Sequence, residues 1–269
     1  MKCLVVADLH YALPQFDWVA EVAERFDFVI IAGDFLDLSS MVDWRTQTIV
    51  VRKYVDMWRA RTRLIGCSGN HDLDSRDSSG EKTSKWIADL GTRGVLSDWQ
   101  SFVGDDALFT VCPWWDGPLG QERLGRLLAA DAPKRTARRW IWVHHAPPDN
   151  SPTSWTGSRS FGDSSLSRWI DQYSPDMVLS GHVHQSPFAK GGSWVDRIGQ
   201  TWVFNAGHQY GKPPAYIAFD TEMEQAVWIS AAGIQCVDLT EALVRPVKSL
   251  YALPLWLTSA DRVGGPTQV

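Results

Sequence analysis

The sequence predicts an α/β fold in which two mixed β-sheets pack face to face with helices on their outer faces. The first half of the chain alternates apolar, strand-like runs with helical segments, and the second half carries strands with few helices between them. This order suits two sheets covered by helices. Short polar clusters follow several of the apolar runs, and open α/β sheets place their sites at such strand ends.

The expected elements can be followed along the chain in order. In the first half we expect strands that begin at Lys2, Phe28 and Arg63, followed by helices over residues 16–25, 45–60 and 82–90. In the second half we expect strands over residues 107–112, 140–143, 177–180, 201–205, 215–220 and 225–230, and helices over 121–130 and 164–173. The pattern weakens after Ile234. We therefore expect a domain over residues 1–235 and a tail over 236–269, whose apolar run 250–257 packs on the domain or forms a homo-oligomer with a partner subunit.

Composition narrows the class of protein. The chain has 269 residues without an obvious linker, and it lacks an apolar run near the ~20 residues that cross a bilayer, so no membrane contact is expected. Its start leads directly into a strand, which predicts no signal peptide and a cytoplasmic protein. The net charge of −5 gives no general attraction to polyanions, so nucleic acid is not the expected partner. The four cysteines lack C-x-x-C spacing and are expected to be buried thiols.

The polar clusters at the strand ends form an ordered set of motifs. They are Asp8-Leu9-His10, Gly33-Asp34, Gly69-Asn70-His71-Asp72, His144-His145 and Gly181-His182-Val183-His184. In this order they resemble the motifs of the calcineurin-like metallophosphoesterases, which read D-x-H, G-D-x-x-D, G-N-H-[DE], a strand-end His, and G-H-x-H. The resemblance runs from residue 8 to residue 184 and implies a four-layer αββα sandwich, the metallo-dependent phosphatase fold.

The resemblance also implies a site for two divalent metal ions, Mn, Fe or Zn. Asp34 is the expected bridging ligand, because the G-D motif supplies it in the family. The expected metal ligands are Asp8, His10, Asp34, Asn70, His182 and His184, together with one histidine of the pair at 144 and 145. A water held between two such ions becomes a nucleophile near neutral pH. Of the seven histidines, only His208 is not accounted for by the motifs.

The histidine pair leaves an alternative open. The end of the hydrophobic strand favours His144 as the ligand, whereas the prolines that follow favour His145. The two side chains point to opposite sides if the chain stays extended. We expect His144, with His145 as the alternative.

The remaining predictions concern catalysis and substrate. His71 is expected to contact the substrate beside Asn70 and to protonate the leaving group, with Asp72 setting its tautomer. The loop over residues 146–161 follows a ligand strand and is expected to overhang the ions. Within that loop, Trp155 and Arg159 are candidate substrate contacts.

The leading hypothesis is a hydrolase of small phosphate esters. The sequence reads Asp37-Leu38-Ser39 where the protein phosphatases of the family have an arginine, which disfavours a protein phosphatase. The size and compactness of the chain resemble those of the small bacterial phosphodiesterases, so a phosphodiesterase is more plausible than a phosphatase. The alternatives are a nuclease acting on short single strands and a metal-bound scaffold without enzyme activity. A scaffold is expected to have lost ligands, and the motifs here are complete.

Overall fold

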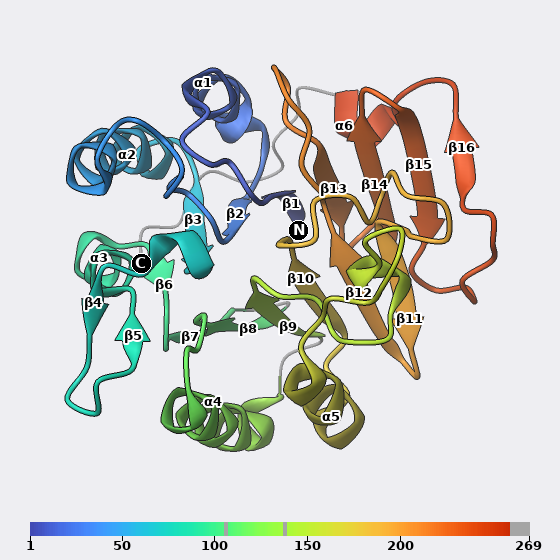
Figure 1. Cartoon of the computed structure of the whole chain (residues 1–269). Coiled ribbons are helices and arrows are strands. Elements are labelled where there is room, and N and C mark those ends of the chain that lie inside the picture. The colour runs from blue at the N-terminus through green and yellow to red at the C-terminus, as the bar shows by residue number, and fades with distance from the viewer. Residues whose placement is uncertain (105–106, 137–138, 259–269) are drawn as a thin grey trace.

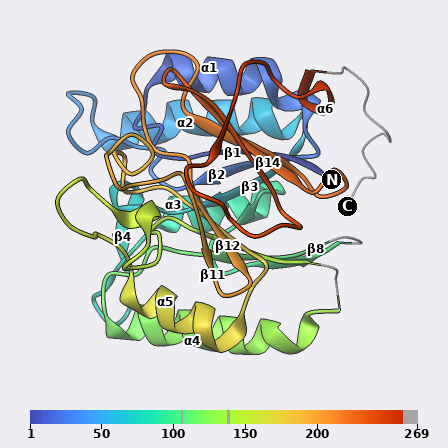
Figure 2. The ribbon, with the colours of Figure 1, turned by 90° about the vertical axis from the view of Figure 1, so that its right-hand side faces the viewer.

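The computed structural model describes residues 1–258 except 105–106 and 137–138. It confirms the predicted sandwich of two mixed sheets between helices (Figures 1 and 2). The strands of the first sheet are β1 (Lys2–Val6), β2 (Phe28–Ala32), β3 (Arg63–Cys67), β6 (Leu96–Ser97), β13 (Tyr216–Asp220), β14 (Gln225–Ser230), β15 (Gly233–Asp238) and β16 (Lys248–Leu250). Those of the second are β7 (Ser101–Val103), β8 (Ala107–Cys112), β9 (Arg139–His144), β10 (Met177–Ser180), β11 (Val195–Ile198) and β12 (Thr201–Asn205).

Each sheet combines a block of parallel strands with antiparallel strands. The first sheet has the order β16-β15-β14-β13-β1-β2-β3-β6, in which β1, β2, β3 and β6 are parallel and the others run antiparallel. The second has the order β11-β12-β10-β9-β8-β7, with β12, β10, β9 and β8 parallel. The parallel strands are Val- and Ile-rich and buried on both faces, as expected where helices cover one side and another sheet the other.

The helices form the two outer layers. They are α1 (Leu13–Val22), α2 (Trp44–Arg59), α3 (Lys85–Leu90), α4 (Pro118–Asp131), α5 (Ser164–Tyr173) and α6 (Leu255–Thr258). The ribbon shows α1 and α2 over the first sheet and α4 and α5 over the second (Figure 2). Apolar residues of α1, α2 and α3 pack on the first sheet, those of α4 and α5 pack on the second, and a third cluster fills the space between the sheets. All the predicted helices and strands are present, with ends shifted by about one turn or less.

Several short strands at the edges of the sheets were not predicted from the sequence. The sequence did not predict the strands β6, β7, β11, β15 and β16 or the hairpin of β4 (Ser75–Arg76) and β5 (Lys82–Thr83). The boundary expected after residue 235 falls inside β15, which pairs with β14 along its length. Trp256 and Leu257 of the tail pack against the first sheet and its helices, and the Trp256 carbonyl accepts a hydrogen bond from Lys2 Nζ at 2.7 Å. The described part of the tail therefore contacts its own chain through β15, β16, Trp256 and Leu257, whereas Tyr251 and Leu255 are exposed. Its role in an oligomer stays a prediction.

Candidate metal centre

The motif residues meet at the carboxyl ends of the parallel strands. The loop after β1 lies beside the loop after β2, where Asp8 N–H donates to the Gly33 carbonyl at 3.1 Å and His10 N–H donates to the Asp34 carbonyl at 3.0 Å. The loops after β3, β9 and β10 supply the other clusters. Two sheets thus contribute to one site, and residues 174 positions apart contact each other across it.

Several site residues have a left-handed backbone that is rare for residues other than glycine. The φ angles are +55° at Asp8, +42° at His10, +55° at Asp34 and +65° at His182. Such conformations cost on the order of 1–3 kcal/mol each and persist where surrounding contacts hold them. At Asp8 those contacts include its carboxylate, which accepts two hydrogen bonds from the His182 N–H at 3.0 and 3.1 Å.

The motif glycines give the acidic and imidazole side chains their room. A Cβ at Gly181 would lie 2.5 Å from Asp8 Oδ2, one at Gly69 would lie 2.7 Å from Asp34 Cγ, and one at Gly33 would lie 2.5 Å from His145 Cγ. Carbon atoms do not approach this closely without displacing their neighbours. The glycines of G-D, G-N-H and G-H-x-H are therefore required by the packing of the site itself.

Three overlapping groups of side chains have donor atoms within 4.8 Å of one another. They are Asp8, His10 and His184; His10, Asp34 and His71; and Asp34, His145 and His182. Asp34 and His10 each belong to two groups, so the described part of the chain presents one continuous cluster. The Nε2 atoms of His10 and His184 face each other at 3.0 Å, and His145 Nε2 lies 3.1 Å from Asp34 Oδ2.

The structure reverses the preference between the two histidines of the pair. His145 is fully buried and its ring lies in the group with Asp34, while its Nδ1 hydrogen-bonds the Ala32 carbonyl at 2.7 Å. The ring of His144 points to the other side, with Nε2 at 3.5 Å from Asp163 Oδ2. The expectation that His144 faces the cluster is wrong, because the extended chain places successive side chains on opposite sides.

The predicted link between His71 and Asp72 is also corrected. Asp72 is fully buried, and its carboxylate accepts hydrogen bonds from the N–H groups of Phe35, Leu36 and Gly69. It thereby fastens the loop after β2 to the loop after β3. The ring of His71 has a different partner, because its Nδ1 accepts the Leu38 N–H at 3.2 Å. A neutral His71 ring therefore carries its proton on Nε2.

Burial and charge act together on the titration of the cluster. Burial works to raise the pKa of Asp8 and Asp34, but the neighbouring imidazoles outweigh it and hold the pKa of each carboxyl below its ordinary value. Burial works to lower the pKa of His145, yet Asp34 and Asp8 raise it to about 9. Burial lowers the pKa of His182 to about 4. The cluster thus concentrates ionised carboxylates in a buried place, where they attract a cation.

Buried polar atoms without a hydrogen-bond partner are a second reason why these side chains fit divalent metal ions. Buried polar atoms in proteins nearly always have a hydrogen-bond partner. Among the described residues, nine buried side-chain atoms have no hydrogen-bond partner, and two of them, Asn70 Oδ1 and His145 Nε2, belong to motif residues expected to bind metal. His144 Nε2 is a third such atom on a motif residue, but it lies beside Asp163 and not in the cluster. An amide oxygen and an imidazole nitrogen are both metal ligands, and each would be satisfied by an ion at this point.

His208 completes the surroundings of the cluster. Its Nδ1–H donates to the Asp8 carbonyl at 2.7 Å, and its ring lies 4.9 Å from that of His184. The motifs gave no signal for this residue, because its place depends on the fold of the loop after β12. It supports the backbone of Asp8.

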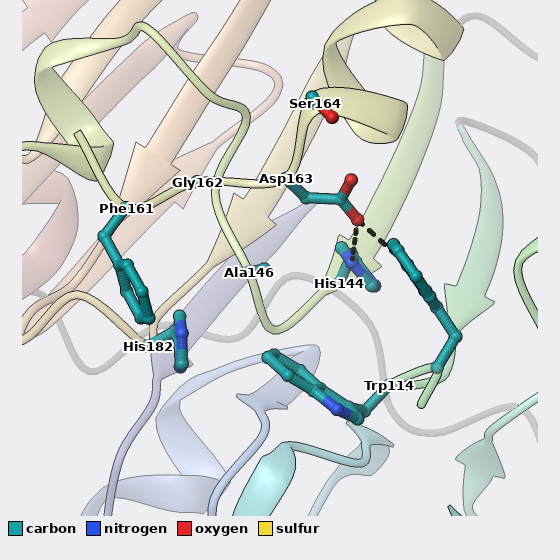
Figure 3. Close-up of a pocket in the computed structure, with 9 residues that line it drawn as sticks. Trp114, His144, Ala146, Phe161, Gly162, Asp163, Ser164 and His182 are labelled. Carbon is teal, nitrogen blue, oxygen red and sulfur yellow. Dashed lines mark hydrogen bonds and ion pairs between the residues drawn. The ribbon is translucent and has the colours of Figure 1, made fainter. Parts of the chain in front are cut away.

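A pocket of about 310 Å³ opens beside His182 (Figure 3). Trp114 and Phe161 line it, and neither was predicted as a site residue. Trp155 does not line it, since its indole Nε1 donates to the Lys190 carbonyl at 3.0 Å. Arg159 is exposed and does not line it either, although its guanidinium carbon lies 5.4 Å from the centre of the Phe161 ring.

The walls of this pocket are tied to the loops of the first sheet. Trp114 N–H donates to Ser68 Oγ at 3.0 Å. Glu81, in the turn between β4 and β5, accepts hydrogen bonds from the N–H groups of Leu119 and Gly120 at 2.8 and 2.6 Å, where α4 begins. A carboxylate at a helix N-terminus is favourable. The hairpin of β4 and β5 thus holds the segment that carries Trp114.

Comparisons with known proteins agree with this geometry. Residues 1–186 match the family model described as calcineurin-like phosphoesterase. A search of curated proteins found no significant match. Among solved structures, TT1561 of Thermus thermophilus has 11% identity and a TM-score of 0.55, covering 88% of this chain and 98% of that one. Purple acid phosphatase PPD1 from yellow lupin seeds has 12% identity and a TM-score of 0.54, covering 100% of this chain and 57% of that one. Likenesses at this identity concern the fold.

The structure also bears on the membrane prediction. In the residues it describes, no helix combines the length and apolar character needed to span a bilayer.

Proposed function

Because the chain belongs to the calcineurin-like phosphoesterase family, we propose that it hydrolyses small phosphoric esters with two divalent metal ions held by the buried cluster. The observation that carries this proposal is the position of Asp34. Its carboxylate belongs to two groups of donor atoms, one with His10 and His71 and one with His145 and His182. A shared carboxylate of this kind is what a pair of ions about 3.5–4 Å apart requires.

The ligands divide into two sets that share Asp34. Asp8, His10 and His184 would hold one ion with it, and Asn70, His145 and His182 would hold the other. Mixed oxygen and nitrogen donors suit Mn, Fe and Zn. When bound, the ions supply Lewis acidity and lower the pKa of a water between them.

His71 is the residue placed for proton transfer. Its ring lies 4.6 Å from that of His10 and is half-buried at the edge of the cluster. The Leu38 N–H occupies Nδ1, so Nε2 holds the proton of the neutral ring. A leaving oxygen at this edge would receive that proton, which makes His71 the general acid of the proposed reaction.

One feature favours diesters over monoesters. A monoester dianion needs more positive charge than a diester monoanion. Leu38 follows Asp37 where the phosphatase branch has an arginine, so the phosphate contact of that arginine is missing here. A substrate with one negative charge therefore suits the site better.

The test measures metal content and hydrolysis together. Purified protein is analysed by mass spectrometry for bound metal and assayed with bis(p-nitrophenyl) phosphate and p-nitrophenyl phosphate. Two ions per chain and faster cleavage of the diester are expected. Asp34→Asn should lose both ions and the activity, whereas Asp43→Asn, which changes an exposed cap of α2, should keep both. An active Asp34→Asn variant with full metal content would contradict the bridging role, and faster monoester cleavage would reverse the diester preference.

A further inference from the structure

The pocket beside His182 has aromatic walls that the metal site does not need. Trp114 lies 5.0 Å from the His182 ring, measured between ring centres, and Phe161 stacks on the same ring at 5.3 Å with an interplanar angle of 23° (Figure 3). Trp115 forms part of the wall as well. A metal ligand needs one hydrogen-bond partner to fix its ring, so this much aromatic surface calls for another explanation.

Phe161 supplies the first part of that explanation. Its side chain is 49% exposed although it is large and apolar, and it lies at the mouth of the pocket. Exposed aromatic surface that lines a concave site commonly serves to bind a ligand. Flat rings pack well on such surfaces in stacked or edge-to-face arrangements.

The wall opposite Phe161 is held by a fixed set of hydrogen bonds. Trp115 Nε1–H donates to Asp163 Oδ2 at 2.9 Å, and the other oxygen of Asp163 accepts from the N–H groups of Ser165 and Leu166 at the start of α5. His144 Nε2 lies 3.5 Å from the same Oδ2, so His144 belongs to this wall (Figure 3). The pocket is therefore formed before a ligand enters it, and little ordering cost opposes binding.

The charges around the pocket define the ligand further. Among the described residues that line the pocket, Asp163 is the one acidic residue. Its carboxylate oxygens already accept hydrogen bonds from the Trp115 indole and from the N–H groups at the start of α5. With no lysine or arginine in the same described lining, an uncharged group is favoured. The ligand group is thus flat, aromatic and neutral.

We infer that this pocket binds a neutral aromatic ring carried by the substrate, while the phosphoryl group of the same molecule lies at the metal cluster. This assignment rests on the proposed function, because His182 lines the pocket and also belongs to the metal cluster. The substrate class is then an aryl phosphoester or a nucleotide. Both present the same flat ring, and they differ in the distance from ring to phosphorus.

Titration calorimetry on the metal-loaded protein tests the inference with two pairs of probes. Methyl(phenyl)phosphinate is compared with dimethylphosphinate, and the non-hydrolysable methylphosphinate analogue of AMP is compared with that of ribose phosphate, so that each probe carries the single negative charge of a diester. Stacking of one ring on aromatic side chains is worth roughly tenfold to a hundredfold in affinity. A preference of this size in the first pair identifies aryl esters, and one in the second pair identifies nucleotides. Equal affinity within both pairs would overturn the inference.

Two single-residue variants test whether a preference for ring-bearing probes depends on this pocket. Phe161→Ala should reduce the ring preference to about threefold or less and leave the metal content unchanged. Phe188→Ala is the matched control, because Phe188 is 42% exposed and packs on Trp228 away from this pocket. The inference is wrong if Phe161→Ala retains the full preference.

A probe without phosphorus separates this inference from the proposed function. Saturation-transfer NMR with phenol on chelator-treated protein needs no metal. Transfer to phenol that is present in the wild type and lost in Phe161→Ala supports the pocket even if no ester is cleaved. Absence of transfer in the wild type would exclude the aromatic pocket, even in a protein that hydrolyses esters.

Discussion

Replacement of Gly69 by alanine places one methyl group against the residue on which the metal site depends. Gly69 has a φ of −106°, which alanine adopts without strain. The added Cβ would lie 2.7 Å from Asp34 Cγ, 2.6 Å from Asp34 N and closer still to Asp34 Oδ1. The contact with the main-chain nitrogen means that a rotation of the Asp34 side chain cannot relieve the clash. The perturbation is therefore steric and is directed at Asp34.

The magnitude follows from the contacts that Asp34 must give up. Overpacking by one methyl group costs about 1–3 kcal/mol. Asp34 Oδ1 accepts the His71 N–H at 2.9 Å, and the loss of a hydrogen bond to a charged group costs about 1.5–3 kcal/mol more. The sum is about 2.5–6 kcal/mol, which lies below most of the ~5–15 kcal/mol range of typical domains, so the variant should be destabilised but folded. A displacement near 1 Å in a catalytic site lowers rates by about a hundredfold.

The assay combines metal analysis, kcat on bis(p-nitrophenyl) phosphate and denaturant unfolding. Gly69→Ala should lose bound metal and about a hundredfold in kcat. Gly125→Ala is the control, because its Cβ would meet Trp169 at an ordinary 3.5 Å inside α4, where alanine favours the helix by about 1 kcal/mol. Full metal content with kcat within threefold of the wild type in Gly69→Ala would refute the steric reasoning.

Three further predictions concern single side chains. His145→Ala should lower the metal content, whereas His144→Ala should leave it intact, as mass spectrometry would show; the reverse result would restore His144 as the ligand. His71→Ala should keep the metal and lower kcat, most severely for esters with poor leaving groups, so an equal loss across leaving groups would exclude a general acid. Burial raises the pKa of Asp98 to about 7, so the folded protein holds a proton there that the unfolded chain has lost above about pH 4. The free energy of unfolding therefore falls as the pH rises from 4 to 7, because the folded protein must lose this proton at a cost. In urea titrations, Asp98→Asn should raise the unfolding free energy by up to about 4 kcal/mol at pH 8 and change it little at pH 4. The same increase at both pH values would contradict this reasoning.

The sequence was sufficient for the fold and for the places where the motifs meet. Long apolar runs identified the central strands, because a strand buried on both faces cannot vary much in polarity. The edge strands β7, β11 and β16 are short and partly exposed, so their sequences resemble those of loops. Strand pairing across the sheet, rather than local sequence, makes them strands.

The error at the histidine pair has a physical origin in the fully apolar strand before it. Trp140 and Trp142 face α4 and α5, while Ile141 and Val143 face the space between the sheets. Side chains alternate along a strand, so His144 follows the tryptophans and the next residue turns toward the cluster. The sequence shows that alternation but does not show which face lies toward the metal site.

The substrate contacts were predicted less well than the metal site. The loop over residues 146–161 follows a predicted ligand strand, and it approaches the site through Phe161 and not through Trp155 or Arg159. Trp114 lies after β8, in a segment without a motif residue. The backbone N–H of Trp114 donates a hydrogen bond to Ser68 Oγ, and this contact holds Trp114 beside the cluster. A contact between two loops that are distant in the sequence cannot be predicted from a local sequence pattern.

The attachment of Glu81 to the start of α4 has a consequence for how this protein can change. The proposed metal ligands follow the ends of buried strands, where a substitution disturbs the close packing of the core. The aromatic wall depends instead on a short surface hairpin, with a second contact from the Lys82 N–H to Asp116 Oδ2 at 3.1 Å. Insertions or replacements in that hairpin can move the wall without altering a metal ligand. The range of accepted esters can therefore diverge between related chains while the hydrolytic chemistry is inherited unchanged.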